Sequence, residues 1–267
     1  MSDAHLNNTK ADGERSLAAV ILAAGRGTRM PGDVPKVVCE VAGRPMVRWV
    51  VEAVRRAGVK PIVLVVGHNA QEVCRVFRGD DGDIIYARQE SQRGTADAIA
   101  SARSALSGLG GDLLVLAADG PLIRTSTIRR LVEHHRRTGA AATLATARID
   151  DPTGYGRILR DRGGRFHAIV EHTDASADER AICEVYPSYA CFDTAMLFDE
   201  VARLKPDAGS NEYRITDVPA SLRARGLRVE LLNGIPPEDV LSINTPQQLR
   251  EVQSILLTRM EQSHELG

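Results

Sequence analysis

A glycine-rich segment follows the first apolar run of this 267-residue chain and carries the residues best suited to chemistry. The run covers residues 17–24; Gly25 and Gly27 come directly after it, and Arg29 and Lys36 follow. Glycines at the end of a strand let backbone N–H groups approach an anion, and the two cations add donors for phosphate oxygens. The spacing therefore predicts a phosphate-binding loop, with a tight turn bearing surface cations as the alternative.

This loop differs from two well-known phosphate-binding motifs. The pattern GxxxxGK[ST] is absent, and Met30 stands where the third glycine of a dinucleotide fingerprint would fall. The sequence also lacks a G-x-S-x-G segment, so it offers no support for nucleophilic hydrolysis. No C-x-x-C pair is present, and we interpret the cysteines as reduced thiols of a cytoplasmic protein. They are Cys39, Cys74, Cys183 and Cys191.

The elements that must position the loop predict an α/β fold. Apolar runs of strand length alternate with amphipathic segments of helix length in the first half of the chain, as in βαβ units. The second half is less regular, and we expect some of its strands to be antiparallel. The expected strands are 17–24, 62–66, 84–87, 113–117, 142–147, 168–171, 184–192 and 227–232, and the expected helices are 45–57, 95–106, 125–138 and 246–260.

Composition and charge exclude several classes of protein. The chain has 34 Lys and Arg against 35 Asp and Glu, which gives a net charge of −1 and no basic excess for nucleic acid or anionic lipid. No apolar run approaches the roughly 20 residues that cross a bilayer, and the polar start does not resemble a signal peptide. We expect a cytoplasmic protein that binds neither nucleic acid nor membrane. Its expected parts are a flexible extension over 1–16, one domain over 17–245 and a C-terminal helix over 246–267.

Several motifs carry a family resemblance. The letters LAAGRGTRM at 22–30, followed by Pro-Lys at 35–36, resemble the signature loop of the sugar-1-phosphate nucleotidyltransferases. DPTGYGRI at 151–158 is more specific, and it resembles the uridyltransferase (pyrophosphorylase) domain of the bifunctional N-acetylglucosamine-1-phosphate uridyltransferases. The likeness runs from about residue 17 to about residue 250. Further motifs in family order are Gln89 before Gly94-Thr95-Ala96, Asp119-Gly120-Pro121-Leu122, Val170-Glu171-His172, Asn211-Glu212-Tyr213 before Thr216-Asp217, and Ile243-Asn244.

The resemblance implies a fold and a reaction. The fold is a Rossmann-like three-layer α/β sandwich with a mixed, mostly parallel sheet, as in the nucleotide-diphospho-sugar transferases. The reaction takes an NTP, expected to be UTP, and a sugar 1-phosphate, and gives a nucleotide sugar and pyrophosphate by in-line attack on the α-phosphorus. Because both substrates are anions, catalysis needs positioning and charge neutralisation more than an acid or base.

The family motifs also assign roles to residues of this chain. Arg29 and Lys36 are implied to be the catalytic residues that clamp phosphates, and Asp119 and Asn244 to hold Mg²⁺ through oxygen atoms. Gln89 is implied to read the base, because its amide can both donate to and accept from the imide edge of uracil. Ala24, Gly25, Gly27, Gly94 and Thr95 are implied to contact the nucleotide, and Gly156, Glu171 and Tyr186 to contact the acceptor.

Two departures from the family pattern fall near the implied acceptor pocket. Tyr186-Pro187-Ser188 stands where the family usually has Asn-Thr-Gly, and Ala118 precedes Asp119 where the family commonly has glycine after an aromatic residue. A pocket built to hydrogen-bond one group discriminates sharply against ligands that lack it. We therefore expect retained nucleotidyl transfer with an altered acceptor, such as an aminosugar or cyclitol phosphate.

Alternatives remain open at this point. The donor is dTTP or GTP in one alternative, and in another the chain is a non-catalytic regulatory protein that binds nucleotide sugars. A glycosyltransferase of similar fold is a third, although no D-x-D motif follows a strand. The hexapeptide repeats of the bifunctional relatives are not visible, so we expect no acetyltransferase activity, and a monomer or homodimer rather than a trimer.

Overall fold

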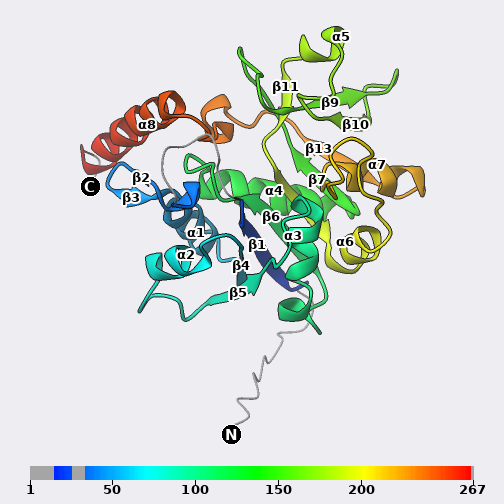
Figure 1. Ribbon diagram of the computed structural model, residues 1–267. Helices are drawn as coiled ribbons and strands as arrows, with labels where there is room; N and C mark the ends of the chain where they lie inside the picture. Colours follow the sequence, from blue (N-terminus) through cyan, green and yellow to red (C-terminus); the bar gives the residue numbers. More distant parts are fainter. Residues whose placement is uncertain (1–14, 26–33, 266–267) are drawn as a thin grey trace, which may run out of the picture.

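A seven-stranded sheet forms the centre of the computed structural model, which describes residues 15–25 and 34–265 (Figure 1). Its strands are β1 (Leu17–Ala23), β4 (Ile62–Val66), β5 (Ile84–Arg88), β6 (Asp112–Ala117), β7 (Ala142–Ala145), β12 (Tyr189–Asp193) and β13 (Val229–Leu232). They lie in the order β13-β7-β12-β6-β1-β4-β5. Strand β12 runs antiparallel to both of its neighbours, and the other pairs are parallel. The predicted mixed, mostly parallel sheet is thereby confirmed.

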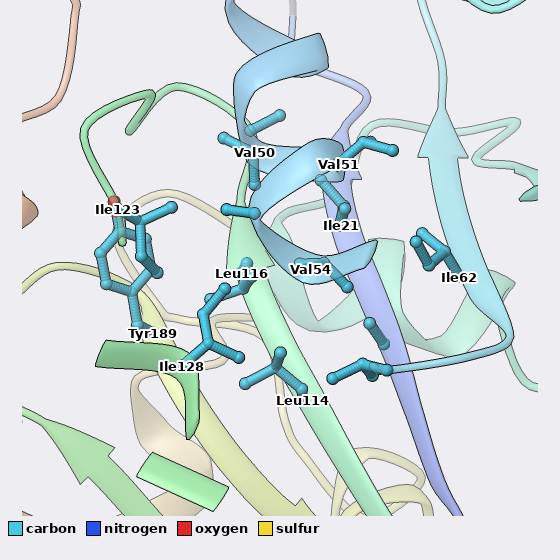
Figure 2. Packing of buried hydrophobic residues seen from close by; sticks show 14 of the residues in the cluster. Ile21, Val50, Val51, Val54, Ile62, Leu114, Leu116, Ile123, Ile128 and Tyr189 are labelled. Atoms are coloured by element: carbon cyan, nitrogen blue, oxygen red, sulfur yellow. The ribbon is translucent and has the colours of Figure 1, made fainter. Parts of the chain in front are cut away.

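Helices cover both faces of this sheet and complete the three layers. One face carries α1 (Met46–Arg56), α2 (Ala70–Val76) and α4 (Thr125–Thr138), and the other carries α3 (Thr95–Ser101), α6 (Thr194–Val201) and α7 (Asp217–Ala224). Alternate side chains of each central strand enter opposite hydrophobic clusters, as the two-residue period of a strand requires. Ile21 and Leu116 pack with Val54 of α1 on the first face (Figure 2), whereas Val20 and Val115 pack on the second.

A smaller antiparallel sheet stands beside one edge of the cavity described below. Its strands are β8 (Ala147–Arg148), β9 (Gly156–Arg160), β10 (Phe166–Val170) and β11 (Glu184–Tyr186), in the order β10-β9-β11-β8, and α5 (Ala177–Arg180) lies next to them. The two expected strands 142–147 and 184–192 were wrong as single elements, because each is divided between the two sheets. The strand residues on both sides of each break are buried, so the hydrophobic pattern alone does not separate them.

Other boundaries agree with the sequence or correct it locally. Helix α4 begins and ends at the predicted residues, whereas the expected helix 95–106 is α3 followed by a separate 3₁₀ turn, η2 (Ser104–Leu106). His135 near the end of α4 is only 2% exposed. Its Nδ1 lies 3.0 Å from Thr143 Oγ1, which gives the buried imidazole a partner.

The C-terminal helix α8 (Pro246–Glu265) packs beside the hairpin of β2 (Glu40–Val41) and β3 (Arg44–Pro45). Its Val252 and Leu256 join Met46 and Ile243 in a third cluster, together with this hairpin. The remaining elements are the 3₁₀ turns η1 (Lys36–Val38) and η3 (Pro237–Val240). Within the two described ranges, no helix combines the length and apolarity needed to span a membrane.

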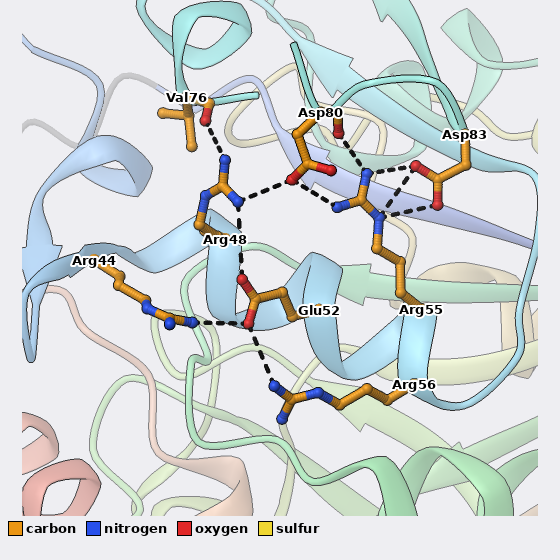
Figure 3. Close-up of polar contacts among 8 residues, drawn as sticks. All are labelled: Arg44, Arg48, Glu52, Arg55, Arg56, Val76, Asp80 and Asp83. Atoms are coloured by element: carbon orange, nitrogen blue, oxygen red, sulfur yellow. Dashed lines mark hydrogen bonds and ion pairs between the residues drawn. The ribbon is translucent and has the colours of Figure 1, made fainter. Parts of the chain in front are cut away.

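An ion-pair network holds the outer face of α1 against the segment that leads into β5 (Figure 3). Arg55 Nε lies 2.9 Å from Asp83 Oδ2, and Arg55 and Arg48 both donate to Asp80. Hydrogen bonds from Arg55 and Arg48 lower the pKa of Asp80, and Glu52 accepts from Arg44 at 3.0 Å. Exposed pairs of this kind contribute little singly, so the network mainly fixes the register of α1 beside the sheet.

Candidate active site

The carboxyl ends of the central strands open into one cavity of about 540 Å³. Segments from both sheets line it, as is typical of ligand sites in open α/β sheets. Gly27 and Arg29 lie outside the described residues, so their predicted roles stay predictions. All the other predicted site residues line this cavity: Ala24, Gly25, Lys36, Gln89, Gly94, Thr95, Asp119, Gly156, Glu171, Tyr186 and Asn244.

Lys36 joins the two predicted metal ligands. Its Nζ lies 2.7 Å from Asp119 Oδ2 and 2.7 Å from Asn244 Oδ1. Asp119 lies two residues after the end of β6, and its carbonyl accepts a hydrogen bond from the backbone N–H of Ile243 at 2.9 Å. That bond brings residue 244 beside residue 119, although 125 positions separate them in sequence. The two oxygens therefore converge on one point that holds a positive charge.

This donor set fits a hard cation. A carboxylate and an amide oxygen are ligands that Mg²⁺ accepts, and Mg²⁺ commonly completes its octahedron with water and substrate phosphates. Among the residues that the structure describes, no group of three or more His, Cys, Asp or Glu side chains is placed to hold a metal. A magnesium ion at Asp119 and Asn244 would therefore take most of its ligands from the substrate and from water.

Tyr155 and Ser242 support Asn244, and sequence reasoning gave neither of them a role. The phenolic oxygen of Tyr155 accepts from the N–H of Ser242 at 2.9 Å, and Ser242 Oγ accepts from Asn244 Nδ2 at 3.1 Å. Burial raises the pKa of Tyr155, so the phenol stays neutral. The only available signal was the place of Tyr155 within the DPTGYGRI motif.

The side-chain amide nitrogen of Gln89 is already hydrogen-bonded within the protein, so only the carbonyl oxygen is left for a ligand. Its side chain is buried, and Nε2 donates to Gly94 O at 3.0 Å and to Asp97 Oδ2 at 2.8 Å. Both partners are acceptors, so they fix the orientation of the amide and use both of its hydrogens. Both amide hydrogens are thus already used, which leaves Oε1 as the acceptor, and the role of Gln89 toward a base stays a prediction.

Position 94 requires glycine, both because of its backbone conformation and because neighbouring atoms leave no space for a Cβ. Its φ is 105°, and a Cβ there would lie 2.4 Å from Tyr213 O and 2.8 Å from Tyr213 N. The next residue, Thr95, accepts from the N–H of Ile215 at 3.0 Å through its hydroxyl, so the segment 211–216 packs against the start of α3. Gln92, which sequence reasoning missed, donates to Ala24 O at 2.6 Å and ties this region to the end of β1.

The acceptor wall, as we call Gly156, Glu171 and Tyr186, comes from the small sheet. Gly156 and Tyr186 are cross-strand partners on β9 and β11. Glu171 Oε1 accepts from Thr216 Oγ1 at 2.8 Å, which holds the carboxylate at the cavity. Burial and then the negative charge of Glu171 raise the pKa of Tyr186, so its phenol is neutral. Ser188, where the family usually has glycine, adopts a φ of 63°.

Tyr189 is the first residue of β12, and like Tyr155 it is an aromatic residue to which sequence reasoning gave no role. It is 1% exposed, and its hydroxyl donates to Gly120 O at 3.3 Å. A Cβ at Gly120 would lie only 1.8 Å from that hydroxyl oxygen. Tyr189 thus fills the space beside Gly120 and supports the turn that carries Asp119.

Comparison with known proteins agrees with this geometry. The MobA-like NTP transferase domain matches residues 19–217. The chain belongs to this family. As a nucleotidyltransferase, it matches curated relatives called "Bifunctional protein GlmU": that of Geobacter metallireducens is 45% identical over 235 residues, which are 88% of this chain and 49% of the relative. The protein of that name from Pelotomaculum thermopropionicum is 45% identical over 244 residues, 91% of this chain and 53% of the relative.

This NTP transferase thus spans about half the length of the curated relatives it matches. Solved structures show the same fold. A UDP-glucose pyrophosphorylase complexed with UDP-glucose has a TM-score of 0.74 at 17% identity, with 92% of this chain and 100% of that chain covered. A putative glucose-1-phosphate thymidylyltransferase from Bacillus anthracis has a TM-score of 0.72 at 19% identity, with 90% and 95% covered. The predicted resemblance to sugar-1-phosphate nucleotidyltransferases is confirmed.

Proposed function

We propose that this NTP transferase moves a nucleoside monophosphate unit, with UTP as its donor, onto the phosphate of a sugar 1-phosphate or a related phosphorylated acceptor. The products are a nucleotide-linked acceptor and pyrophosphate. One observation carries the proposal: a single cavity brings together the residues predicted for the base, the cation and the acceptor. The names of the curated and structural relatives support the same chemistry.

The order of strands supports the way the donor would lie. Gln89 follows β5 at the edge of the sheet, Ala24 follows β1, and Asp119 follows β6. Three strand spacings separate the ends of β5 and β6, which amounts to about 14 Å. A nucleotide whose base lies at Gln89 can therefore place its phosphates near Lys36 and Asp119, with the acceptor wall beyond them.

The reaction needs no proton transfer from the protein. An oxygen of the acceptor phosphate forms a bond to the α-phosphorus, and the bond from that phosphorus to the β-phosphate oxygen breaks, so pyrophosphate leaves with the electron pair. Lys36 supplies a positive charge that offsets the charge on the phosphates. Magnesium, held by Asp119 and Asn244, would neutralise phosphate oxygens when bound. Glu171 and Gly156 orient the acceptor.

The orientation of Gln89 supports a uridine donor. Its Oε1 accepts a hydrogen bond, so it fits a base whose ring nitrogen carries a hydrogen, as in uracil, thymine and guanine. The corresponding nitrogen of cytosine or adenine has no hydrogen, so these bases could donate to Oε1 only through the adjacent exocyclic amino group, from a shifted position in the site. We therefore expect CTP and ATP to be poor donors.

The acceptor is proposed to differ from the usual one of the family. Tyr186 puts a neutral, buried phenol where the family usually has asparagine, beside a carboxylate that Thr216 holds in place. A ring offers an apolar surface and one hydroxyl, whereas asparagine offers two amide donors and an oxygen. This composition favours an acceptor with hydroxyl groups toward Glu171 over one that depends on an amide contact.

Pyrophosphate release over a grid of NTPs and phosphorylated acceptors tests the proposal. The grid includes N-acetylglucosamine 1-phosphate, glucose 1-phosphate and cyclitol phosphates, with Mg²⁺ present or replaced by EDTA. Asp119→Asn keeps the size of the side chain and removes its charge, and Asp81→Asn on an exposed turn is the matched control. We expect one acceptor to react with UTP, with at least about a hundredfold loss in Asp119→Asn only. An inactive grid, together with tight binding of a nucleotide sugar, would contradict catalysis and favour a regulatory role.

A further inference from the structure

Arg157 is a buried cation that the proposed reaction does not use directly. It lies on β9 next to Gly156, and it is 1% exposed. Its hydrogen-bond partners are two backbone carbonyl oxygens and a ring nitrogen of His172, none of them a carboxylate, and its Nε has no partner. Burial lowers the pKa of this guanidinium, which shows that its charge is held at a cost. Such an arrangement calls for a role other than ion pairing.

The guanidinium links three segments behind the acceptor wall. Nη1 donates to the carbonyl oxygen of Tyr155, immediately before Gly156. Nη2 lies 3.2 Å from Nδ1 of His172, the residue after Glu171, and 3.5 Å from the carbonyl oxygen of Arg180 at the end of α5. One planar group therefore holds the loop that carries Gly156 and the loop that carries Glu171 at a fixed separation.

We propose that Arg157 and His172 form a positioning pair that fixes the acceptor wall, and that the pair holds only while His172 is neutral. The inference rests on the proposed nucleotidyl transfer. An arginine has no acceptor atom, so Nδ1 of His172 must accept, and the imidazole carries its hydrogen on Nε2. A second proton on His172 would place an N–H group and a positive charge next to the guanidinium. The hydrogen bond would then be lost and replaced by repulsion.

Other groups around His172 do not remove this conflict. The carboxylate of Asp151 lies on the exposed loop before β9 and is already engaged by Thr153, and the carboxylate of Glu171 is held by Thr216. A cation near the guanidinium, Arg180, adds to the repulsion. Asp151, Arg180 and Cys183 are the charged or titratable groups that act on Arg157, Asp151 also lies near His172, and Glu171 adjoins His172 in the chain.

Steady-state kinetics with variants of His172 test the proposal. In the parent enzyme we expect the KM for the acceptor to rise roughly tenfold when acid conditions protonate His172, with the KM for the NTP within about twofold. In His172→Gln, an amide oxygen can accept from Arg157 but cannot be protonated, so the acceptor KM stays low and the acid rise disappears. His172→Leu raises the acceptor KM about tenfold at every pH.

Two controls separate positioning from general damage. His167→Gln changes an exposed histidine that also contacts an arginine, Arg223, at 3.4 Å, and we expect it to keep the parental pH profile. Arg157→Lys loses the fork that spans the two loops, so it raises the acceptor KM even if it folds as well as the parent. The tautomer of His172 is read separately from imidazole ¹⁵N shifts, where a hydrogen on Nδ1 would overturn the proposal.

Failure of the pair and failure of the proposed function give different results. Absence of turnover in the parent over the whole grid would refute nucleotidyl transfer, and the acceptor role of the pair with it. Turnover in the parent, with an acid rise that persists in His172→Gln, would refute the pair alone. A joint rise of both KM values in His172→Leu would also refute it, because loss of the pair should affect only the acceptor.

Discussion

Gly120→Ala is a small change with a large expected effect, because the new methyl group would meet a buried tyrosine. The Cβ would lie 1.8 Å from the hydroxyl oxygen of Tyr189 and 3.0 Å from its Cζ. Ordinary contact begins at about 3.4 Å, so the hydroxyl would have to withdraw by about 1.6 Å. Tyr189 is 1% exposed and lies beside Ile123 and Ile128 (Figure 2), so its ring has no free space to enter.

The cost follows from three contributions. Overpacking of this kind costs about 1–3 kcal/mol, and loss of the hydrogen bond from Tyr189 to the Gly120 carbonyl about 1 kcal/mol. Replacing glycine also reduces the freedom of the unfolded chain, which returns about 0.4–1 kcal/mol. We expect Gly120→Ala to lower the free energy of unfolding by roughly 2–3 kcal/mol. Because Asp119 is the adjacent residue, a shift of about 1 Å should also slow turnover about a hundredfold.

A double variant decides whether the clash is the cause. Tyr189→Phe removes the oxygen and should cost about 1 kcal/mol alone. Adding Gly120→Ala to that background should then cost less than about 1 kcal/mol, because the remaining neighbour is Cζ at 3.0 Å. Urea unfolding and pyrophosphate release measure both effects. If Gly120→Ala matched the parent, or if its cost were unchanged in the Tyr189→Phe background, the reasoning would be wrong.

Three further predictions concern single positions. Gly94→Ala should raise the KM for the NTP at least about tenfold in steady-state kinetics, since the Cβ would meet backbone atoms of Tyr213 and φ is 105°. Ser188→Gly should raise the free energy of unfolding in urea by up to about 1 kcal/mol, and Ser188→Val should lower it, because φ is 63°. Burial tends to raise the pKa of Glu184, but hydrogen bonds, chiefly from Arg160, outweigh burial and lower it. Its stabilisation is therefore present above the ordinary glutamate value of about 4.3 and lost as the pH falls through the lowered pKa, so Glu184→Gln should show a smaller acid loss in unfolding experiments.

Sequence patterns predicted most of the first half of the fold because the signals of those elements are local, although they missed α2 and the hairpin of β2 and β3. Strands such as β4 are buried on both faces and read as unbroken aliphatic runs, whereas amphipathic helices between them repeat every three to four residues. Helix α4 also ends at Gly139, whose φ of 60° stops the helix. The boundaries of these elements are set by residues within a few positions of each other.

The second half depends on contacts between distant residues. The run 184–192 is mostly apolar because both of its strands are buried, so its hydrophobic pattern alone does not mark the change of sheet at Pro187-Ser188. The supporting residues of the site were missed for the same reason. Tyr155 is 87 positions from Ser242, and Tyr189 is 69 positions from Gly120. The motifs identified what contacts a ligand, but not what holds those residues in place.

In the proposed function the two sheets divide the site between donor and acceptor, and the departure at Tyr186-Pro187-Ser188 falls on the acceptor side. Gln89, Lys36 and Asp119 belong to the edge of the large sheet, where a change would disturb the chemistry common to all such reactions. Tyr186 is the last residue of β11 in the small sheet, and Ser188 follows that strand. Both lie on the side of the acceptor wall. Because separate strands hold the two halves, the acceptor contacts can change while the donor site keeps its geometry. An altered acceptor is thus the change in function that this architecture permits most readily.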